Sequence, residues 1–159
     1  MTKVLMVCLG NICRSPVAEG VLRHIANKKG MKITVDSAGT ANYHVGEAPD
    51  KRSIANAKKN GVDISMLRGR QFSAKDFEEF DHIFAMDENN LKNVLSLAKT
   101  EGHKQKVDLL LNTIHPNKNM PVPDPYYGTE KDFDKVFELV NKACEELTER
   151  LKKEPDEQK

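Results

Sequence analysis

Four short apolar runs, separated by stretches with helical patterns, constrain the fold of this chain most strongly. The runs are rich in β-branched residues and have about the length of a strand; they cover residues 3–8, 33–37, 82–86 and 106–111. Candidate helices occupy residues 16–29, 51–60, 74–80, 88–100 and 132–153. Nearly continuous apolar strands that alternate with helices are typical of an α/β fold, in which helices cover both faces of a parallel sheet.

Length and charge balance limit the function classes open to the chain. A chain of 159 residues forms one compact domain, which we expect to cover residues 1–153, whereas residues 154–159 are polar and predicted to be a disordered tail. The 25 basic and 24 acidic residues give a net charge of +1, so no global field attracts nucleic acid or an acidic membrane. Any anion site must therefore be local.

Cysteine usage and hydropathy indicate the compartment. Three cysteines, an odd number, argue against a disulfide scaffold and favour a reducing environment. The apolar run at residues 4–9 is shorter than the core of a signal peptide, and no stretch approaches the roughly 18 apolar residues of a membrane span. We therefore expect a cytoplasmic protein without membrane attachment.

The segment after the first predicted strand, CLGNICRSP, has the layout of an anion site. Cys8 ends the strand, Arg14 opens the following helix, and Ser15 with Pro16 indicates an N-cap followed by proline at the first helical position. The residues between Cys8 and Arg14 can curl so that their N–H groups point inward. This predicts a cradle for a tetrahedral dianion with a thiolate at its base, which is suited to phosphoryl transfer to sulfur.

A long irregular stretch at residues 112–129 is the second candidate element of the site. It contains four prolines, and a loop of this length inside a compact domain is more often functional than idle. Asp124 lies between Pro123 and Pro125 and could act as a general acid aimed over the cradle.

Taken together, these segments resemble those of the low-molecular-weight protein tyrosine phosphatases over nearly the whole chain. The matching segments are CLGNICRSP, DSAGT at residues 36–40, AMD at residues 85–87 and DPYYG at residues 124–128, in the family's order and at compatible spacing. The resemblance implies a three-layer α/β fold with a four-stranded, mostly parallel sheet and a phosphate-binding loop after the first strand. It implies neither a metal nor an organic cofactor.

The resemblance also implies the catalytic roles. Cys8 would be the nucleophile that forms a phosphocysteine, Arg14 the bidentate phosphate ligand, and Ser15 the hydroxyl that stabilises the thiolate. Asp124 would protonate the leaving phenolate oxygen and then, as a carboxylate, activate water. The substrates would be phosphotyrosine-containing proteins and small aryl phosphates. We expect a monomer, and the aromatic rim leaves weak self-association open.

Further residues are implied to bind the substrate. The backbone of the loop would surround the phosphate, with Asn11 holding the loop in a strained form, and three tyrosines would wall a slot too deep for phosphoserine. These residues are Leu9, Gly10, Asn11, Ile12, Cys13, Tyr43, Tyr126 and Tyr127.

One position departs from the family pattern. Many members carry a hydrogen-bonding His where this chain has Leu67, and that His joins a network with the positions of Asn11, Ser15 and Ser37. We expect the network here to be shorter or completed by water.

The remaining cysteines receive separate predictions. A tightly curled loop brings the Cα atoms of Cys8 and Cys13 within the ~4.4–6.8 Å that a disulfide tolerates, so we predict that Cys13 traps oxidised Cys8. Cys144 lies in the apolar stripe of the last predicted helix and is expected to be inert core.

Three alternatives remain open. Arsenate reductases of this fold need further cysteines after the third strand, and residues 85–100 contain none. Arginine-phosphate phosphatases tend to carry Thr at the position of Ile12, whose larger side chain favours a flat phenyl ring. A metal-binding module could use Cys8 and Cys13 with His24 or His44, but a single Cys pair is weak support.

Overall fold

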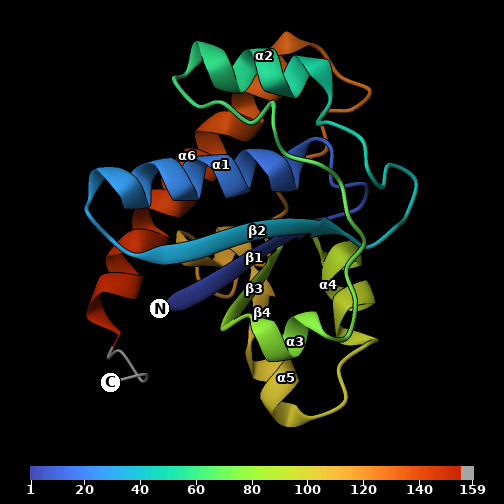
Figure 1. The fold of residues 1–159 in the computed structure, drawn as a ribbon, viewed down its shortest axis with the longest axis vertical. Helices are drawn as coiled ribbons and strands as arrows, with labels where there is room; N and C mark the ends of the chain where they lie inside the picture. The colour runs from blue at the N-terminus through green and yellow to red at the C-terminus, as the bar shows by residue number, and fades with distance from the viewer. Residues whose placement is uncertain (155–159) are drawn as a thin grey trace.

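The computed structural model describes residues 1–154 and contains four strands and six α-helices (Figure 1). The strands are β1 (Thr2–Cys8), β2 (Ile33–Gly39), β3 (His82–Ala85) and β4 (Val107–Leu109). The helices are α1 (Arg14–Lys28), α2 (Lys51–Lys59), α3 (Asp76–Glu79), α4 (Glu88–Leu95), α5 (Glu101–Gln105) and α6 (Glu130–Lys153), with a 3₁₀ turn, η1, at Leu110–Thr113. Of the predicted disordered tail, residues 155–159 lie outside the described residues.

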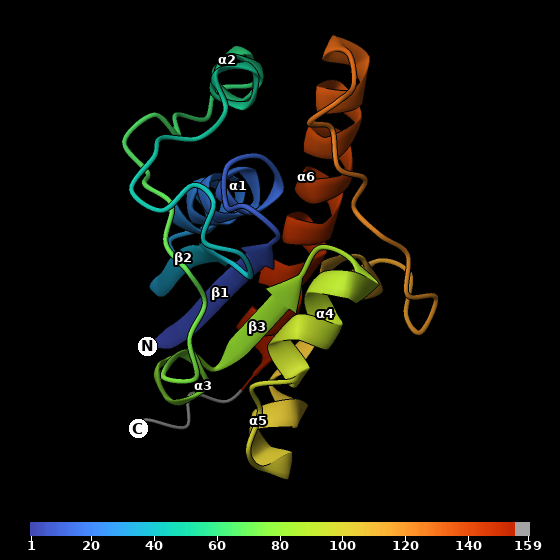
Figure 2. The same cartoon turned by 90° about the vertical axis from the view of Figure 1, so that its right-hand side faces the viewer.

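The four strands form one parallel sheet in the order β2-β1-β3-β4, which confirms the predicted fold class. Helices α1 and α6 pack on one face of this sheet, and α3, α4 and α5 lie on the other, so the protein has three layers (Figure 2). Parallel strands place their carboxyl ends at one edge, and the loops after β1 and β3 therefore emerge side by side. Cys8 and Ala85 end these two neighbouring strands.

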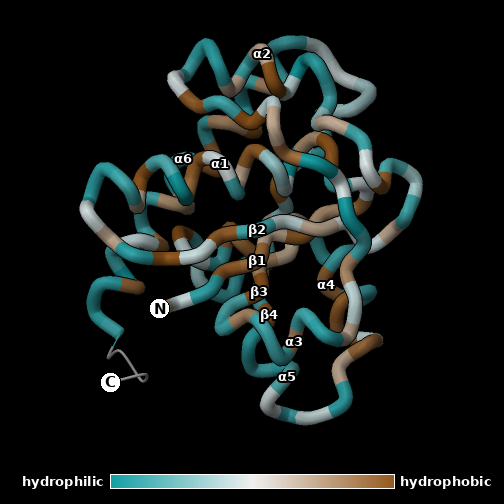
Figure 3. The backbone as a smooth tube through the Cα atoms, viewed as in Figure 1, coloured by the Kyte–Doolittle hydropathy of each residue, from teal (hydrophilic) through white to brown (hydrophobic). Residues whose placement is uncertain are grey.

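Alternate residues of β1 face opposite layers, as the geometry of a strand requires. Val4, Met6 and Cys8 join the large apolar core under α1 and α6, whereas Leu5 and Val7 join a smaller, phenylalanine-rich core on the other face. The central strand β1 is accordingly coloured mainly as hydrophobic in Figure 3. None of the described helices is long and apolar enough to cross a membrane.

The start of α1 corrects the sequence prediction. The helix begins at Arg14 with Cys13 as its N-cap, so Ser15 is not the cap and Pro16 stands at the third helical position. Proline is tolerated there because the first-turn N–H groups have no intrahelical acceptor. The hydroxyl of Ser15 is committed instead to Cys8 and Asn11.

Three other boundaries differ from the sequence pattern. The helix expected at residues 88–100 ends at Leu95, because the side chain of Thr100 accepts a hydrogen bond from the His103 N–H and caps a separate helix, α5. The last strand is only three residues long and passes directly into η1. Helix α6 begins at Glu130 rather than at residue 132, since Thr129 and Asp132 form a capping box.

Helix α6 buries the predicted apolar stripe. Cys144 is fully buried within this stripe, and burial raises the pKa of its thiol. The thiol therefore stays protonated, in accord with its predicted place in the core.

Candidate active site

The loop after β1 is closed around the sulfur of Cys8. Cys8 is 3% exposed, its Sγ lies 2.9 Å from Ser15 Oγ, and the Asn11 N–H donates to it at 3.3 Å. The positive end of α1 begins in the same loop, at Arg14. These donors point at the sulfur and can stabilise negative charge that develops on it during a reaction.

Asn11 holds the loop from beneath. Its φ of 59° lies in the left-handed region, which strains most non-glycine residues and which asparagine tolerates better than most. Its Nδ2 donates to Ser15 Oγ at 2.8 Å and to Ser37 Oγ at 3.0 Å, while its Oδ1 accepts from the Arg70 backbone N–H at 3.0 Å. Asn11 therefore ties the loop to β2 and to the segment before α3.

The polar network continues from Ser37 to Glu19, a buried residue of α1. Ser37 Oγ donates to Glu19 Oε1 at 2.6 Å, and Arg23 Nη2 donates to Glu19 Oε2 at 2.6 Å. Leu67 instead packs half-buried against the large apolar core. The network thus ends on Glu19, a buried carboxylate paired with Arg23, because α1 brings Glu19 one turn beyond Ser15.

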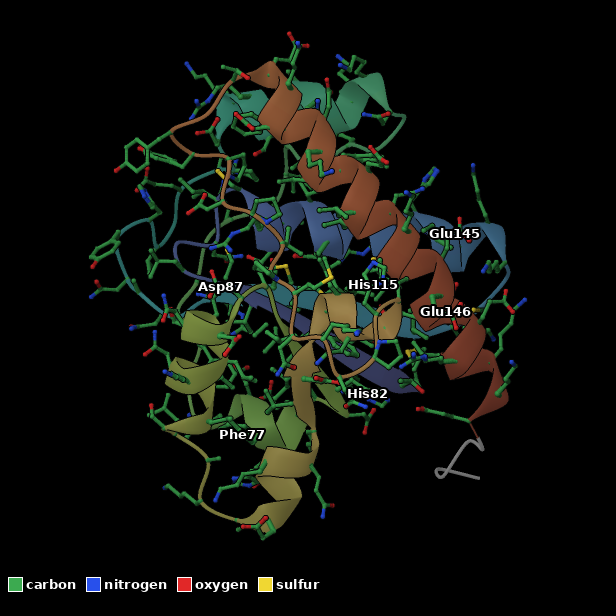
Figure 4. All side chains as sticks on the ribbon, turned by 180° about the vertical axis from the view of Figure 1, so that it is seen from behind. Phe77, His82, Asp87, His115, Glu145 and Glu146 are labelled. Carbon is green, nitrogen blue, oxygen red and sulfur yellow. The ribbon has the colours of Figure 1, made fainter. Side chains whose placement is uncertain are left out.

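The side chain of Arg14 is fixed by Asp87, in the loop after β3, and by the backbone of Val122. Its side chain is 4% exposed, and its Nη1 donates to Asp87 Oδ2 at 2.7 Å and to the Val122 carbonyl at 3.0 Å. Asp87, labelled in Figure 4, caps the N-terminus of α4, where its Oδ1 accepts from the Asn90 N–H. Because Nη1 is held in this way, the guanidinium has a fixed plane and can present Nη2 to a ligand.

Asp124 lies across from Arg14 in the proline-rich loop that precedes α6. Its side chain is about half exposed, with Oδ2 at 3.7 Å from Arg14 Nη2 and Oδ1 accepting from the Tyr126 N–H at 3.1 Å. The loop is attached to the sheet by the Val122 N–H, which donates to the Met86 carbonyl. The carboxyl thus faces the cradle rather than solvent alone.

A cavity of about 250 Å³ joins these elements at the carboxyl end of the sheet. It is lined by Cys8, Leu9, Gly10, Ile12, Cys13, Arg14, Tyr43, His44, Asp124, Tyr126 and Tyr127. Asn11 and Ser15, the other predicted site residues, are buried behind this lining. The structure therefore brings all the predicted site residues together, ten of them in the wall of the cavity and two beneath it.

The mouth of the cavity is aromatic. Tyr43 is 71% exposed and Tyr127 is 96% exposed, whereas Tyr126 is more protected and meets Tyr127 edge to face at 4.8 Å between ring centroids. A planar aromatic group can enter between such rings and bury its faces.

Two residues near the site are not among the catalytic and substrate-binding residues predicted from the sequence. Asp87 was contained in the AMD segment, and its place after a strand and before a helix was a sufficient signal for a cap at the sheet edge. His44 lines the cavity beside Gly10, with Nδ1 at 3.0 Å from Glu47 Oε2, and its adjacency to Tyr43 was the available signal.

Comparison with known proteins decides the family. The family model described as low molecular weight phosphotyrosine protein phosphatase matches residues 3–157. The chain belongs to this family. As a low molecular weight phosphotyrosine protein phosphatase it is an enzyme, a hydrolase of phosphoric monoesters.

Individual relatives agree with this membership. A putative low molecular weight protein-tyrosine-phosphatase of Synechocystis is 43% identical over 154 residues, covering 96% of this chain and 98% of that protein. A protein tyrosine phosphatase of Entamoeba histolytica, crystallised with Hepes in the active site, superposes with a TM-score of 0.90 at 39% identity, covering 96% of this chain and 97% of that one. The Drosophila arginine phosphatase superposes with a TM-score of 0.89 at 34% identity, covering 97% and 100%.

Proposed function

We propose that this phosphatase hydrolyses phosphotyrosine and small aryl phosphates through a phosphocysteine on Cys8. One observation carries the proposal: the Sγ of Cys8, bound by Ser15 Oγ and the Asn11 N–H, lies at a cavity whose wall also contains Arg14 and Asp124. Nucleophile, phosphate ligand and proton donor thus share one space.

In the first step, the phosphate dianion occupies the loop, bound by backbone N–H groups and the free edge of Arg14. The Cys8 thiolate attacks phosphorus, the bond from phosphorus to the aryl oxygen breaks, and Asp124 gives its proton to that oxygen. Phenol leaves, and the phosphoryl group remains on sulfur.

In the second step, water attacks the phosphocysteine and Asp124, now a carboxylate, takes the proton from that water. The phosphorus–sulfur bond breaks and the electron pair returns to Cys8 as thiolate. The Ser15 hydroxyl, 2.9 Å from Sγ, stabilises this leaving group by donating to it. Since Ser15 Oγ also accepts from Asn11 Nδ2, its own proton is available for the sulfur.

The aromatic mouth and Ile12 support an aryl substrate. Ile12 lines the cavity and packs against Cys13 and Phe133, so it presents an apolar wall where a hydroxyl would suit a guanidinium product. Turnover of phosphotyrosine, phosphoserine and phosphoarginine peptides of one sequence tests this proposal. We expect phosphotyrosine to be preferred at least about 100-fold in kcat/KM, equivalent to roughly 2.7 kcal/mol of transition-state binding. Preference for phosphoarginine would overturn it.

We also propose that Cys13 protects Cys8 from irreversible oxidation. Both thiols are free, buried and part of the same cavity wall. Peroxide would convert Cys8 to a sulfenic acid, and the Cys13 thiol would displace its hydroxyl as water to form the disulfide. Burial raises the pKa of Cys13 to about 12, so Cys8 is the thiol that peroxide attacks first.

Wild type and Cys13→Ser can be treated with peroxide and then with a dithiol, and the bond mapped by mass spectrometry. Wild type should recover activity and Cys13→Ser should not. Equal recovery, or a bond to Cys144, would refute this role.

We further propose a cytoplasmic, essentially monomeric enzyme. The three free cysteines favour a reducing compartment, and the exposed tyrosines offer only a small apolar patch for self-association. Sedimentation at micromolar and millimolar concentrations would show a monomer that dimerises weakly.

A further inference from the structure

Arg52, in the first turn of α2, lies outside the cavity and joins two of its walls. Its guanidinium binds the Asp50 carboxylate through Nε and Nη2, at 3.0 and 2.9 Å. Its Nη2 also donates to the Tyr126 carbonyl at 2.8 Å, although 74 positions separate the two residues. In Figure 1 the orange loop before α6 runs beside the N-terminal end of α2, where this contact forms.

One end of this connection is fixed to the phosphate loop. The Asp50 N–H donates to the Ile12 carbonyl at 2.8 Å, and the Asp50 carboxylate also caps α2 by accepting from the Arg52 N–H at 2.8 Å. The guanidinium carbon of Arg52 lies 4.8 Å from the ring centre of Phe133, and this ring packs against Ile12 and Cys13. Arg52 therefore rests on the back of the phosphate loop through both its charge and its flat face.

The other end is fixed to the loop that carries Asp124. In the described segment 123–128, the bond from Arg52 is the one hydrogen bond that comes from a distant element; the Tyr126 N–H to Asp124 and the Gly128 N–H to Pro125 are local. The backbone of Tyr126 thus makes two hydrogen bonds: its carbonyl accepts from Arg52 Nη2, and its N–H donates to Asp124 Oδ1 and orients that carboxyl. A displacement of Tyr126 would therefore displace the carboxyl.

We propose that Arg52 is a positioning residue for proton transfer, which sets the carboxyl of Asp124 at the height of the leaving oxygen above Cys8. This inference rests on the proposed function of Asp124. Arg52 does not line the cavity; its outer side faces a separate groove with Ala55 and Lys59. It acts on the reaction through Tyr126, without contact to the substrate.

The chemistry of the side chain suits this task. A guanidinium is planar and can bind a carboxylate with one edge, a carbonyl with a shared N–H and an aromatic ring with its face. A lysine ammonium is a point charge and satisfies only part of this set. The Asp50 carboxylate stays ionised for the contact, because its hydrogen bonds with Arg52 lower its pKa.

The test is the dependence of kcat/KM on the leaving group. The comparison is between kcat/KM for phenyl phosphate and kcat/KM for 4-nitrophenyl phosphate, both of which report on the first step. The phenolate of phenyl phosphate is basic and needs a proton to leave, whereas 4-nitrophenolate leaves readily without one. A general acid typically raises the rate ~10²–10⁴-fold, and the effect is largest for basic leaving groups. An acid that is displaced but still present should retain part of this rate increase. We expect Arg52→Met to lower kcat/KM roughly 10-fold with phenyl phosphate but less than about 3-fold with 4-nitrophenyl phosphate.

Three further variants make the result decisive. Arg52→Lys should fall between wild type and Arg52→Met, and Arg52→Met in an Asp124→Asn background should cause no additional leaving-group-dependent loss. Arg68→Met is the matched control, since Arg68 is exposed and, within residues 1–154, its side chain donates only to the carbonyls of Ser65 and Leu67. It should retain the wild-type ratio between the two substrates.

The outcomes separate the two proposals. If Asp124→Asn loses equally with both substrates, the acid role of Asp124 is wrong. Suppose instead that Asp124→Asn loses more kcat/KM with phenyl phosphate, as expected. If Arg52→Met then lowers kcat/KM equally with both substrates, or if its loss adds to that of Asp124→Asn, Arg52 has only a structural role. In that case the inference about Arg52 is wrong and the acid role of Asp124 stands.

Discussion

Asn11 offers the sharpest test of how the loop is held. The substitution Asn11→Ala removes two hydrogen bonds that Nδ2 donates and one that Oδ1 accepts, all at a residue that is 3% exposed. At ~0.5–1.5 kcal/mol for each bond, the loss is roughly 2–4 kcal/mol. The left-handed φ of 59° adds about 1 kcal/mol for alanine. We therefore expect Asn11→Ala to lower the free energy of unfolding by roughly 3–5 kcal/mol.

Urea unfolding followed by far-ultraviolet circular dichroism measures this loss, since the chain has no tryptophan to serve as a fluorescent probe. Asn11→Gly should be about 1 kcal/mol more stable than Asn11→Ala, because glycine adopts positive φ without a steric penalty. Asn117→Ala is the matched control: Asn117 is exposed, has φ 63° and its side chain makes no hydrogen bond among the described residues. It should lose no more than about 1 kcal/mol. A loss at Asn11→Ala no greater than at Asn117→Ala would refute the reasoning.

Three other predictions follow from the same contacts. Because Asp124 gives its proton to the leaving oxygen, Asp124→Asn should lower kcat/KM more with phenyl phosphate than with 4-nitrophenyl phosphate; an equal loss with both substrates would remove Asp124 from the acid role. The lowered pKa of Asp50 contributes stability above its unfolded value of 3.8, which is lost as pH falls through the folded pKa; Asp50→Asn should therefore be destabilising at pH 7 and nearly neutral in strong acid, by urea unfolding. Leu67→His should leave kcat unchanged or raise it modestly, and a large loss of stability would show that the half-buried leucine is essential core.

The alternation of apolar runs and helical patterns in the sequence predicts most of the fold. Val4, Leu5, Met6 and Val7 are all buried, as a central parallel strand requires, and the run they form was therefore visible in the sequence. The break at residue 96 was not visible, because it depends on Thr100 preferring to cap a new helix. Propensity does not decide such local competition; the packing of α5 beside β4 does.

The site likewise contains residues that the sequence predicts and residues that only the folded structure reveals. The spacing of Cys8 and Arg14 predicts an anion cradle, and the place of Asp124 between two prolines of a long loop makes it a candidate acid. Glu19 looks like any polar residue of a helix, and only the proximity of β2 to α1 reveals that it binds Ser37. The sequence predicts Ser15 as an N-cap, because serine often caps a helix; in the structure its hydroxyl binds Cys8 and Asn11, which only the folded loop brings near.

Trapping the covalent intermediate tests the central claim most directly. Rapid acid quench during turnover of 4-nitrophenyl phosphate, followed by mass spectrometry of the digested protein, should locate one phosphoryl group on the peptide that contains Cys8. Cys8→Ser should show no such adduct and less than a few per cent of wild-type turnover. A phosphoryl group on another residue, or substantial turnover by Cys8→Ser, would contradict the account.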